Sequence, residues 1–503
     1  NSEIYIDKTE LLKFLNKKLG TNGKCIAVSH ARRFGKSHAA GMIDAYYSLG
    51  SDSSKLFENT KIASDPDYEK YRNKYNVIHL DISSVWDYHK EDLIESIEER
   101  VCEDFQKIYG DLLNYRRDFY LLIQDIYSLT GIPFVIIIDE WDCVIRNSHD
   151  QALVHKYLQF LHSLFKSEES KSFLALGYIT GILPIKKIKD ESALNNFQEY
   201  TMLDSYPITE YYGFTEKEVK DLCKDYSMDF ETVKAWYNGY LIDGEHMYNP
   251  NSVSQALERH KIDSYWRNTS AFDTINTFIT MNYAGLKDDV MKMLTGGKVR
   301  INTNTFQNDF SIITSKDDAL TALIHLGYLG YDADRKKSFI PNYEVATAFE
   351  LALQTGSWKE IAESISKCDE LLDETIDGNA ERVAELIELA HETYTSILKY
   401  NDENVLSCVL TMAYFTAPAY YNVIREMPSG KGFADFVFLP RANAGNRPAM
   451  IIELKYNQSA ETALKQIKEK RYQGALSGYQ GKILLVGINY DSEKHHTCMI
   501  EEL

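Results

Sequence analysis

Two apolar segments near the end of the chain, residues 432–439 (Gly-Phe-Ala-Asp-Phe-Val-Phe-Leu) and 450–455 (Met-Ile-Ile-Glu-Leu-Lys), each contain an acidic residue within a strand-like pattern. Acidic side chains are seldom buried without partners, so these two need an explanation. Side chains alternate between the faces of a strand, which places Glu453 and Lys455 on the same face. If the segments pair as a hairpin across residues 440–448, Asp435 reaches that face as well.

Two carboxylates and an amine on one face predict a divalent-cation site. Hard oxygen ligands suit Mg²⁺ or Mn²⁺. A neighbouring ammonium group can stabilise phosphate charge or help to deprotonate a metal-bound water. The pattern therefore predicts phosphodiester hydrolysis. The alternative is an ordinary hairpin in which Glu453 and Lys455 form a solvated pair.

The pattern resembles the PD-(D/E)XK nuclease superfamily, whose core has an acid on one strand and Glu-x-Lys on the next. The resemblance implies that Asp435, Glu453 and Lys455 are catalytic and that the two acids hold the metal. Members often add an acid from the preceding helix and a polar residue from the following one. The matching positions here are Glu403 and Gln466, the latter with Tyr472.

A second motif lies near the start, where the apolar residues 24–28 run into Ser-His-Ala-Arg-Arg-Phe-Gly-Lys-Ser at 29–37. This pattern is typical of a P-loop, whose backbone N–H groups and helix N-terminus hold phosphates. We expect Lys36 to reach the β and γ oxygens of ATP and Ser37 to hold Mg²⁺. Arg33 and Gly35 belong to the same predicted loop. His30 occupies the position of the motif's first glycine, and its Cβ predicts a different path into the loop.

Residues 133–142, Pro-Phe-Val-Ile-Ile-Ile-Asp-Glu-Trp-Asp, predict a central parallel strand that ends in acids at the nucleotide crevice. Asp139 is expected to support Mg²⁺, and Glu140 to orient or activate the attacking water. A further strand at 173–181 would bring Thr180 near the γ-phosphate. Each segment alone is also compatible with a buried strand that has a polar end. Three residues are candidates for an arginine finger, without an assignment: Arg32, Arg33 and Arg146.

Nearly the whole chain resembles the AAA-ATPase-like proteins that carry a C-terminal PD-(D/E)XK nuclease domain. The family's usual loop begins Arg-Pro-Arg-Arg-Phe-Gly-Lys, where this chain has His30 and Ala31. Besides the nuclease motifs, the resemblance rests on residues 5–9, 32–37, 138–142, 180–181, 194–196, 212–216, 236–240, 248–250, 265–266, 327–329 and 341–345.

The resemblance implies an α/β fold with an AAA-like P-loop NTPase parallel sheet, a helical or winged-helix-like extension, and a restriction-endonuclease-like α/β domain. A length of 503 residues suits about three domains. The predicted limits are 1–204 for the ATPase-like domain, 205–345 for the extension, 346–392 for an acidic helical linker and 393–503 for the nuclease-like domain.

Composition indicates a soluble globular protein, with 44% hydrophobic and 26% charged residues. No apolar run approaches the roughly 20 residues of a membrane span, so no membrane association is expected. Seven cysteines without a Cys-x-x-Cys pair favour reduced thiols and a cytoplasmic location. His495, His496 and Cys498 could bind a metal, but a frayed tail is the expectation.

The net charge of −19 is unevenly distributed. Residues 390–503 contain 12 Lys and Arg against 12 Asp and Glu, whereas residues 359–393 contain 11 acids and 3 bases. The acidic stretch has helical periodicity and predicts amphipathic helices between two domains. One hypothesis is that its surface shields the nuclease site from DNA, and the alternative is a solvated helix face. The bases expected to meet phosphates are Lys465, Lys468, Lys470 and Arg471.

These patterns together predict an ATP-binding, Mg²⁺-dependent DNA nuclease regulated by its P-loop ATPase domain. DNA is the expected partner, and homo-oligomerisation is left open. One alternative is a nucleotide-switched nucleic-acid-binding or scaffold protein whose nuclease-like domain does not cleave. Another is an ATPase that acts on protein partners.

Overall fold

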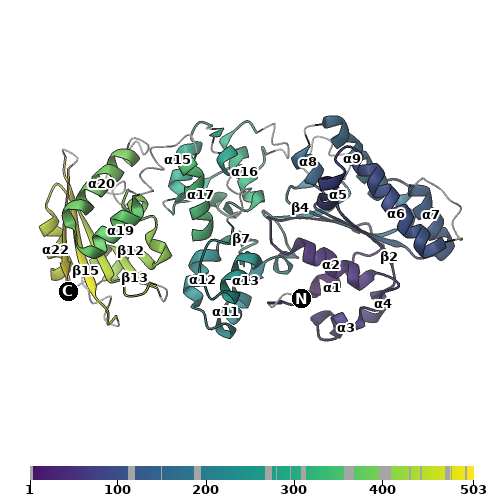
Figure 1. The fold of residues 1–503 in the computed structure, drawn as a ribbon, viewed down its shortest axis with the longest axis horizontal. Helices are drawn as coiled ribbons and strands as arrows, with labels where there is room; N and C mark the ends of the chain where they lie inside the picture. Colours follow the sequence, from purple (N-terminus) through teal and green to yellow (C-terminus); the bar gives the residue numbers. More distant parts are fainter. Residues whose placement is uncertain are drawn as a thin grey trace. The chain divides into compact units, whose positions relative to one another are not determined.

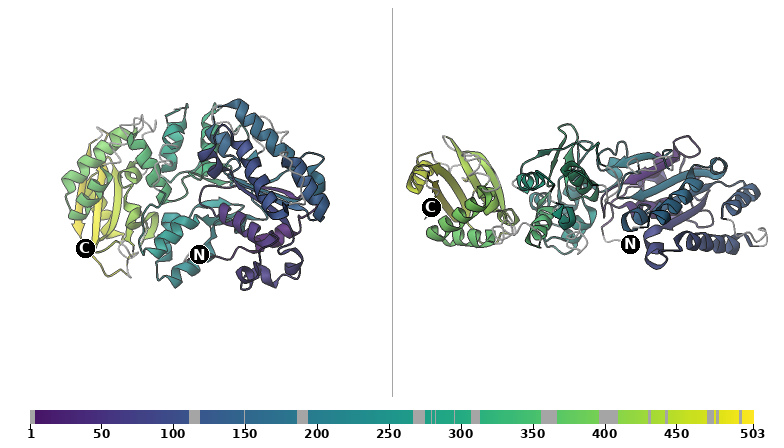
Figure 2. Two further views of the ribbon diagram at one scale, coloured as in Figure 1. Left: turned by 45° about the vertical axis from the view of Figure 1, so that its right-hand side comes forward. Right: turned by 90° about the horizontal axis from the view of Figure 1, so that it is seen from above.

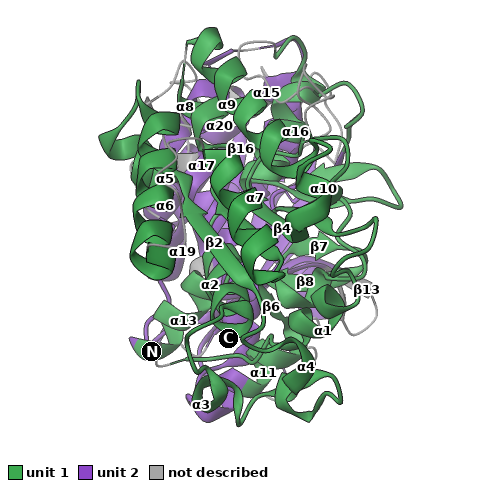
Figure 3. Cartoon of the chain, turned by 90° about the vertical axis from the view of Figure 1, so that its right-hand side faces the viewer, with its two compact units in different colours: residues 1–221, 239–258, 300–338 green, residues 222–238, 259–299, 339–503 purple. Residues whose placement is uncertain are grey.

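A computed structural model describes most of the chain, in two compact units (Figure 3). Unit 1 comprises residues 1–221, 239–258 and 300–338, and unit 2 comprises residues 222–238, 259–299 and 339–503. The described residues are 4–110, 119–148, 150–185, 194–266, 275–278, 280–281, 283–294, 296–306, 313–355, 367–395, 409–429, 432–441, 444–470, 476, 479–492 and 495–503.

The main sheet of unit 1 is parallel throughout, which confirms the predicted parallel α/β sheet. In the described residues it has five strands in the order β2-β3-β4-β1-β5. The strands β3 and β4 are buried along their whole length, which explains why their sequences are continuous apolar runs. The strands are β1 (Cys25–Ser29), β2 (Asn76–Asp81), β3 (Phe134–Asp139), β4 (Leu174–Gly181) and β5 (Gln198–Thr201).

Helices cover both faces of this sheet (Figure 1). One face packs against α1 (Glu10–Asn16) and α2 (Lys36–Tyr47), with Ile26 and Val28 in that core. The other face, which includes Ala27, packs against α6 (Leu93–Tyr109), α7 (Phe119–Thr130) and α9 (Gln151–Phe165). The shorter helices are α3 (Ser54–Phe57), α4 (Tyr68–Tyr71), α5 (Ile82–Tyr88), α8 (Cys143–Asn147) and α10 (Ser170–Phe173).

The predicted extension, residues 205–345, is divided between the two compact units. It contains two small sheets, ordered β6-β8-β7 and β10-β11-β9 in the described residues. The limits of the compact units differ from the predicted limits at 204 and 345, and the domain boundaries stay a prediction. The elements are β6 (Phe214–Thr215), α11 (Glu216–Asp225), α12 (Phe230–Tyr237), β7 (Tyr240–Ile242), β8 (Glu245–Tyr248), α13 (Pro250–Glu258), α15 (Leu286–Leu294), β9 (Val299–Arg300), α16 (Lys316–Leu326), β10 (Gly330–Asp332) and β11 (Lys337–Phe339).

Unit 2 contains a mixed sheet, ordered β12-β13-β14-β15-β16 in the described residues. The antiparallel pairing of β13 with β14 confirms the predicted hairpin across residues 440–448. The strand β14 then pairs in parallel with β15, and α22 (Ala460–Glu469) lies between them in the sequence. The strands are β12 (Tyr421–Ser429), β13 (Gly432–Pro440), β14 (Ala449–Tyr456), β15 (Ile483–Tyr490) and β16 (His496–Glu502).

Helices also cover both faces of the mixed sheet. On one face Leu464 and Ile467 of α22 share a core with Ile451 and Leu485. On the other face α20 (Ala380–Thr395) lies beside α19 (Cys368–Asp377), as both views of Figure 2 show. The ring of His391 in α20 lies 4.3 Å from that of Tyr490. Leu485 faces the core under α22, and because side chains alternate along β15, Tyr490 lies on the opposite face. A further long helix in the described part of unit 2 is α17 (Tyr343–Thr355).

The chain's tail is ordered, and the expectation of a frayed tail was wrong. The strand β16 pairs with β15 from His496 to Glu502. The side chain of His496 is buried, and its Nε2 lies 2.9 Å from Nδ1 of His391. The period-2 pattern His-x-Cys-x-Ile at 496–500 is the strand signal that the expectation overlooked. Among the described helices, none combines the length and apolar character needed to cross a bilayer.

Candidate functional site

The register of β13 and β14 brings the two predicted carboxylates together. Phe436 pairs with Ile452, so Asp435 and Glu453 are neighbours across the strands at the next position. Ile451, two residues before Glu453, faces the core under α22. Because side chains alternate, both carboxylates lie on the face that α22 covers. The geometry expected from the sequence is therefore present.

Glu453 is nearly inaccessible, with 2% of its surface exposed. Its Oε1 accepts a hydrogen bond from Nζ of Lys455 at 2.9 Å and another from Nε2 of Gln466. The Lys455 ammonium also donates to the backbone carbonyl of Leu454 at 2.9 Å. The other carboxylate oxygen of Glu453, Oε2, is buried and has no hydrogen-bond partner among the described residues. The structure thus brings Glu453, Lys455 and Gln466 into contact and leaves one acceptor unsatisfied.

Asp435 is held beside this group by the backbone. Its Oδ2 accepts a hydrogen bond from the N–H of Leu454 at 2.7 Å. Burial and the neighbouring Asp435 raise the pKa of the Glu453 carboxyl, while Lys455 and then Lys470 act in the opposite direction. Two adjacent carboxylates, one with an unsatisfied buried oxygen, form an environment that a cation would stabilise.

The helix α22 comes close to the sheet at the level of Glu453. Its N-terminus is capped by Ser459, whose Oγ accepts from the N–H of Thr462 at 3.1 Å. Gly487 pairs with Glu453 in the β14–β15 ladder. A Cβ at position 487 would lie 3.1 Å from Cβ of Ala463, and closer still to the carbonyl oxygen of Ala460. The missing side chain therefore lets α22 approach near enough for Gln466 to reach Glu453.

Three residues predicted for this site lie outside the described residues: Glu403, Tyr472 and the predicted phosphate contact Arg471. Within the residues that the structure describes, no group of three or more His, Cys, Asp or Glu side chains is arranged to hold a metal ion. In that part of the chain, the oxygen donors at this position are the carboxylates of Asp435 and Glu453.

The predicted P-loop connects β1 to α2. Gly35 has a left-handed φ of 87° and immediately precedes the first residue of α2, Lys36. No side chain at Gly35 caps this helix, so its first N–H groups point into the loop uncapped. Arg33 is also left-handed, with φ of 65°, whereas residue 30 is outside the left-handed region. The loop therefore does not require a glycine at position 30.

The ring of His30 lies in an aromatic cluster with Phe34 and Tyr212. Its Nε2 lies 2.9 Å from Oγ of Ser205, and its ring centroid lies 5.2 Å from that of Tyr212. The N–H of His30 donates to the carbonyl of Gly181 at 3.1 Å, which extends the pairing of β1 with β4. Burial, and then the charge of Lys36, lower the pKa of His30 to about 3. The ring is therefore neutral at physiological pH.

The ammonium group of Lys36 lies within the loop itself. Its Nζ donates to the carbonyl oxygens of His30 and Ala31, both at 2.8 Å. Burial lowers the pKa of Lys36, and the carboxylate of Glu140 is the first of three acids that act in the opposite direction. The side chains of Ser37 and Arg33 are exposed.

The acidic end of β3 lies next to the end of β4, because these strands are neighbours in the sheet. The Oδ1 of Asp139 accepts from the N–H of Glu140 at 3.0 Å and from the hydroxyl of Thr180. Since β4 also pairs with β1, Thr180 lies between the acidic strand and the strand that leads into the P-loop. The expected grouping of Asp139, Glu140 and Thr180 is present.

An ion-pair network around Glu140 includes Asp142, a residue to which the sequence patterns gave no role. The Arg146 guanidinium lies 2.6 Å from Oε2 of Glu140 and 2.9 Å from Oδ2 of Asp142. Asp142 is fully buried and also accepts from the N–H groups of Ile182 and Leu183. The i, i+4 spacing of Asp142 and Arg146 after an acidic strand end was the signal available.

Arg146 is thus engaged within its own unit, with 9% of its side chain exposed, and is not presented as an arginine finger. It borders a cavity of about 490 Å³ beside Glu140. The cavity is lined by Arg32, Ser83, Trp86, Asp87, Lys90, Glu140, Cys143, Arg146 and Asn147.

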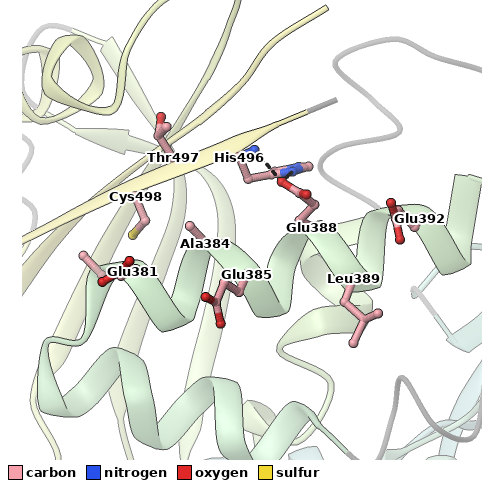
Figure 4. Close-up of a pocket in the computed structure, with 10 residues that line it drawn as sticks. Glu381, Ala384, Glu385, Glu388, Leu389, Glu392, His496, Thr497 and Cys498 are labelled. Atoms are coloured by element: carbon pink, nitrogen blue, oxygen red, sulfur yellow. Dashed lines mark hydrogen bonds and ion pairs between the residues drawn. The ribbon is translucent and has the colours of Figure 1, made fainter. Parts of the chain in front are cut away.

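A second cavity, of about 510 Å³, lies between α20 and the start of β16 (Figure 4). Four glutamates of α20 line it, at positions 381, 385, 388 and 392, and Glu388 pairs with His496. The packing of His391 on Tyr490 places α20 on the face opposite to α22. The acidic helix therefore lies across the sheet from Glu453, and this arrangement does not support the shielding hypothesis for α20.

Comparisons with known families match both ends of the chain. Residues 1–189 match the family described as predicted AAA-ATPase. Residues 401–500 match the PD-(D/E)XK nuclease superfamily. The chain therefore contains a predicted AAA-ATPase domain and a PD-(D/E)XK nuclease superfamily domain, which confirms the resemblance found in the sequence.

A curated relative and several solved structures are similar to parts of the chain. An uncharacterized protein in the vnfD 5' region of Azotobacter chroococcum mcd 1 is 24% identical over 274 residues, 53% of this chain and 50% of that protein. The chain thus spans about half the length of this curated relative. AMPPCP-bound DnaA from Aquifex aeolicus has a TM-score of 0.29 at 11% identity, over 80% of this chain and 90% of that chain. The Aeropyrum pernix ORC1 protein in complex with DNA has a TM-score of 0.28 at 12% identity, over 70% of this chain and 93% of that chain. These values describe a distant likeness and carry no information about function.

Proposed function

We propose that this chain is an ATP-binding, Mg²⁺- or Mn²⁺-dependent DNA nuclease in which the P-loop domain regulates phosphodiester hydrolysis in the nuclease domain. One observation carries the proposal. The carboxylates of Asp435 and Glu453 lie side by side next to the Lys455 amine, with the buried Oε2 of Glu453 lacking a hydrogen-bond partner among the described residues.

The donor set fits a hard divalent cation, because both groups offer carboxylate oxygens and one of those oxygens is unsatisfied. Asp435 and Glu453 would hold the ion. When bound, it supplies Lewis acidity towards a phosphoryl oxygen and lowers the pKa of a bound water. The backbone N–H of Leu454 fixes Asp435, and the amide of Gln466 fixes Glu453, so both ligands are oriented in advance.

Among the described residues, Lys455 is well placed to act on the reacting atoms. Its ammonium lies 2.9 Å from Oε1 of Glu453, and 13% of its side chain is exposed. From this position it can stabilise negative charge that develops on the phosphate, or hold a proton at the oxygen of the attacking water. The neutral amide of Gln466 donates to the same carboxylate and positions it without titrating at neutral pH.

The P-loop domain is proposed to bind ATP. The uncapped N-terminus of α2 and the loop N–H groups suit phosphates, with Arg33, Gly35 and Lys36 around them. Ser37 and Asp139 would hold Mg²⁺, Thr180 would position Asp139, and Glu140 would orient the attacking water. Regulation of the nuclease by this site is proposed because both domains belong to one chain.

The test is cleavage of plasmid and single-stranded DNA with Mg²⁺ or Mn²⁺, with and without ATP. We expect divalent-dependent product from the wild type and none from Glu453→Ala or Lys455→Ala. Lys465→Ala is a matched control, because Lys465 lies on α22 with an exposed side chain. If no metal and nucleotide condition gives product with the wild type, the nuclease proposal is wrong. Cleavage by Lys36→Ala that no longer responds to ATP would establish the regulatory link.

A further inference from the structure

The helix α22 and its C-cap carry three lysines that the structure places on different sides. Successive residues of an α-helix are rotated by about 100° around its axis. Relative to Gln466, which contacts Glu453, Lys465 is therefore rotated by about 100° and Lys468 by about 160°, but Lys470 by only about 40°. The sequence alone assigned all three lysines to phosphate contacts without distinguishing them.

The two lysines that are rotated away are engaged in ion pairs elsewhere. Lys465 lies 3.8 Å from Glu469 on the same helix, and 72% of its side chain is exposed. Lys468 pairs with Glu501 of β16. Both lysines therefore serve as internal controls for the third.

Lys470 continues the helical geometry by one residue beyond the last turn. Its φ of −83° and ψ of −3° are helical, and its N–H donates to the carbonyl of Gln466 at 3.0 Å. The i, i+4 relation places its side chain above Gln466, on the face that meets the carboxylate pair. Lys470 is partly exposed, and its charge acts on Glu453.

We infer that Lys470 is a substrate-binding residue of the nuclease site, whose ammonium contacts a backbone phosphate of the DNA next to the phosphodiester that is cleaved. This inference deepens the proposed function and rests on it. Lys455 is largely buried against Glu453 and the Leu454 carbonyl, and in the proposed function its ammonium acts at the phosphodiester that is cleaved, so the neighbouring phosphate needs another positive charge. Lys470 supplies that charge from the solvent side, as a point charge on a flexible stem.

The experiment measures binding separately from cleavage. A fluorescently labelled duplex oligonucleotide is titrated with full-length protein in Ca²⁺ and also without divalent ions, at several salt concentrations. We expect Lys470→Gln to weaken binding by about tenfold at low salt, as expected for loss of one charge-assisted hydrogen bond. The slope of log K against log salt should decrease by about 0.9, the value for one phosphate contact. Lys470→Arg should keep most of the binding, and Lys465→Gln should match the wild type.

A purely structural role for Lys470 would change other readouts. The thermal midpoint of Lys470→Gln should stay at the wild-type value, and its calorimetrically measured affinity for Mn²⁺ should not fall, because removal of a positive charge near Glu453 favours a cation. If Lys470→Gln and Lys465→Gln bind the duplex with equal affinity and equal salt slope, the inference is wrong, even if the wild type cleaves DNA. If Lys470→Gln alone binds weakly but the wild type never cleaves, the inferred role of Lys470 in DNA binding is supported and the nuclease proposal is wrong. A wild type that does not bind the duplex would overturn both.

Discussion

The close approach of α22 to the sheet at Gly487 gives the most demanding prediction, because one added methyl group should disturb both stability and metal binding. In Gly487→Ala the new Cβ would lie 3.1 Å from Cβ of Ala463 and from Cγ of Leu464. Carbon atoms in ordinary contact lie about 3.5–4.0 Å apart, so α22 must retreat by roughly 0.5 Å or more. Overpacking of this kind costs about 1–3 kcal/mol.

A retreat of α22 also draws Gln466 away from Glu453. Loss of a group that orients a metal ligand typically weakens metal binding by about 10–100-fold, and a partial displacement should give about tenfold. A loss of about 2 kcal/mol in a unit of the size of unit 2 should lower the unfolding temperature of Gly487→Ala by about 4–8 °C relative to the wild type. The affinity of this variant for Mn²⁺ should decrease by about tenfold.

The assay is thermal unfolding together with calorimetric titration of Mn²⁺ into metal-free full-length protein. Glu453→Gln gives the baseline for Mn²⁺ that binds elsewhere. Gly41→Ala is the matched control, since a Cβ at Gly41 meets no atom within 4 Å and alanine favours the interior of α2. A Gly487→Ala variant with wild-type stability and wild-type Mn²⁺ affinity would refute the packing argument.

Three further predictions concern single side chains. Burial and Asp435 raise the pKa of Glu453 above its usual 4.5, so the protonated carboxyl favours the folded state. The stability that protonation contributes is complete below pH 4.5 and is lost as the pH rises through the raised pKa. In denaturant titrations of metal-free protein, Glu453→Gln should therefore be more stable than the wild type at pH 8, and the difference should vanish below pH 4.5. Arg146→Ala should destabilise unit 1 by about 3–5 kcal/mol in such titrations, because it leaves the buried Asp142 charge uncompensated; wild-type stability would contradict this. Lys36→Ala should lose ATP binding in a fluorescent-nucleotide assay, whereas unchanged affinity would show that the loop is not the nucleotide site.

Much of the fold was predictable because it depends on local periodicity. The continuous apolar run that ends at Asp139 predicts a buried parallel strand, and alternation predicts that Glu453 and Lys455 share a face. The pairing with Asp435 followed once the hairpin was assumed. In these cases a short segment of sequence determines its own burial.

The features that were missed depend on residues far apart in the sequence. The orientation of His30 is set by Ser205, 175 residues away, so its effect on the loop could not be judged from the motif. The reach of Gln466 depends on the absence of a side chain at Gly487, in a strand that follows the helix. The tail was misjudged because its alternation is short and contains polar residues, and only the pairing with β15 makes it a strand.

The register of β13 against β14 determines both the position of the carboxylate pair and the packing of the core. An insertion or deletion within β13 would therefore affect the proposed chemistry and the folding together. If one residue is gained or lost between Asp435 and Val437, either the acid or the apolar residues beyond it must turn to the opposite surface of the sheet. A shifted acid would abandon Glu453, and shifted apolar residues would expose the core under α22. Length variation among related chains should therefore be confined to the connection between these strands, where a change of any size leaves both properties intact.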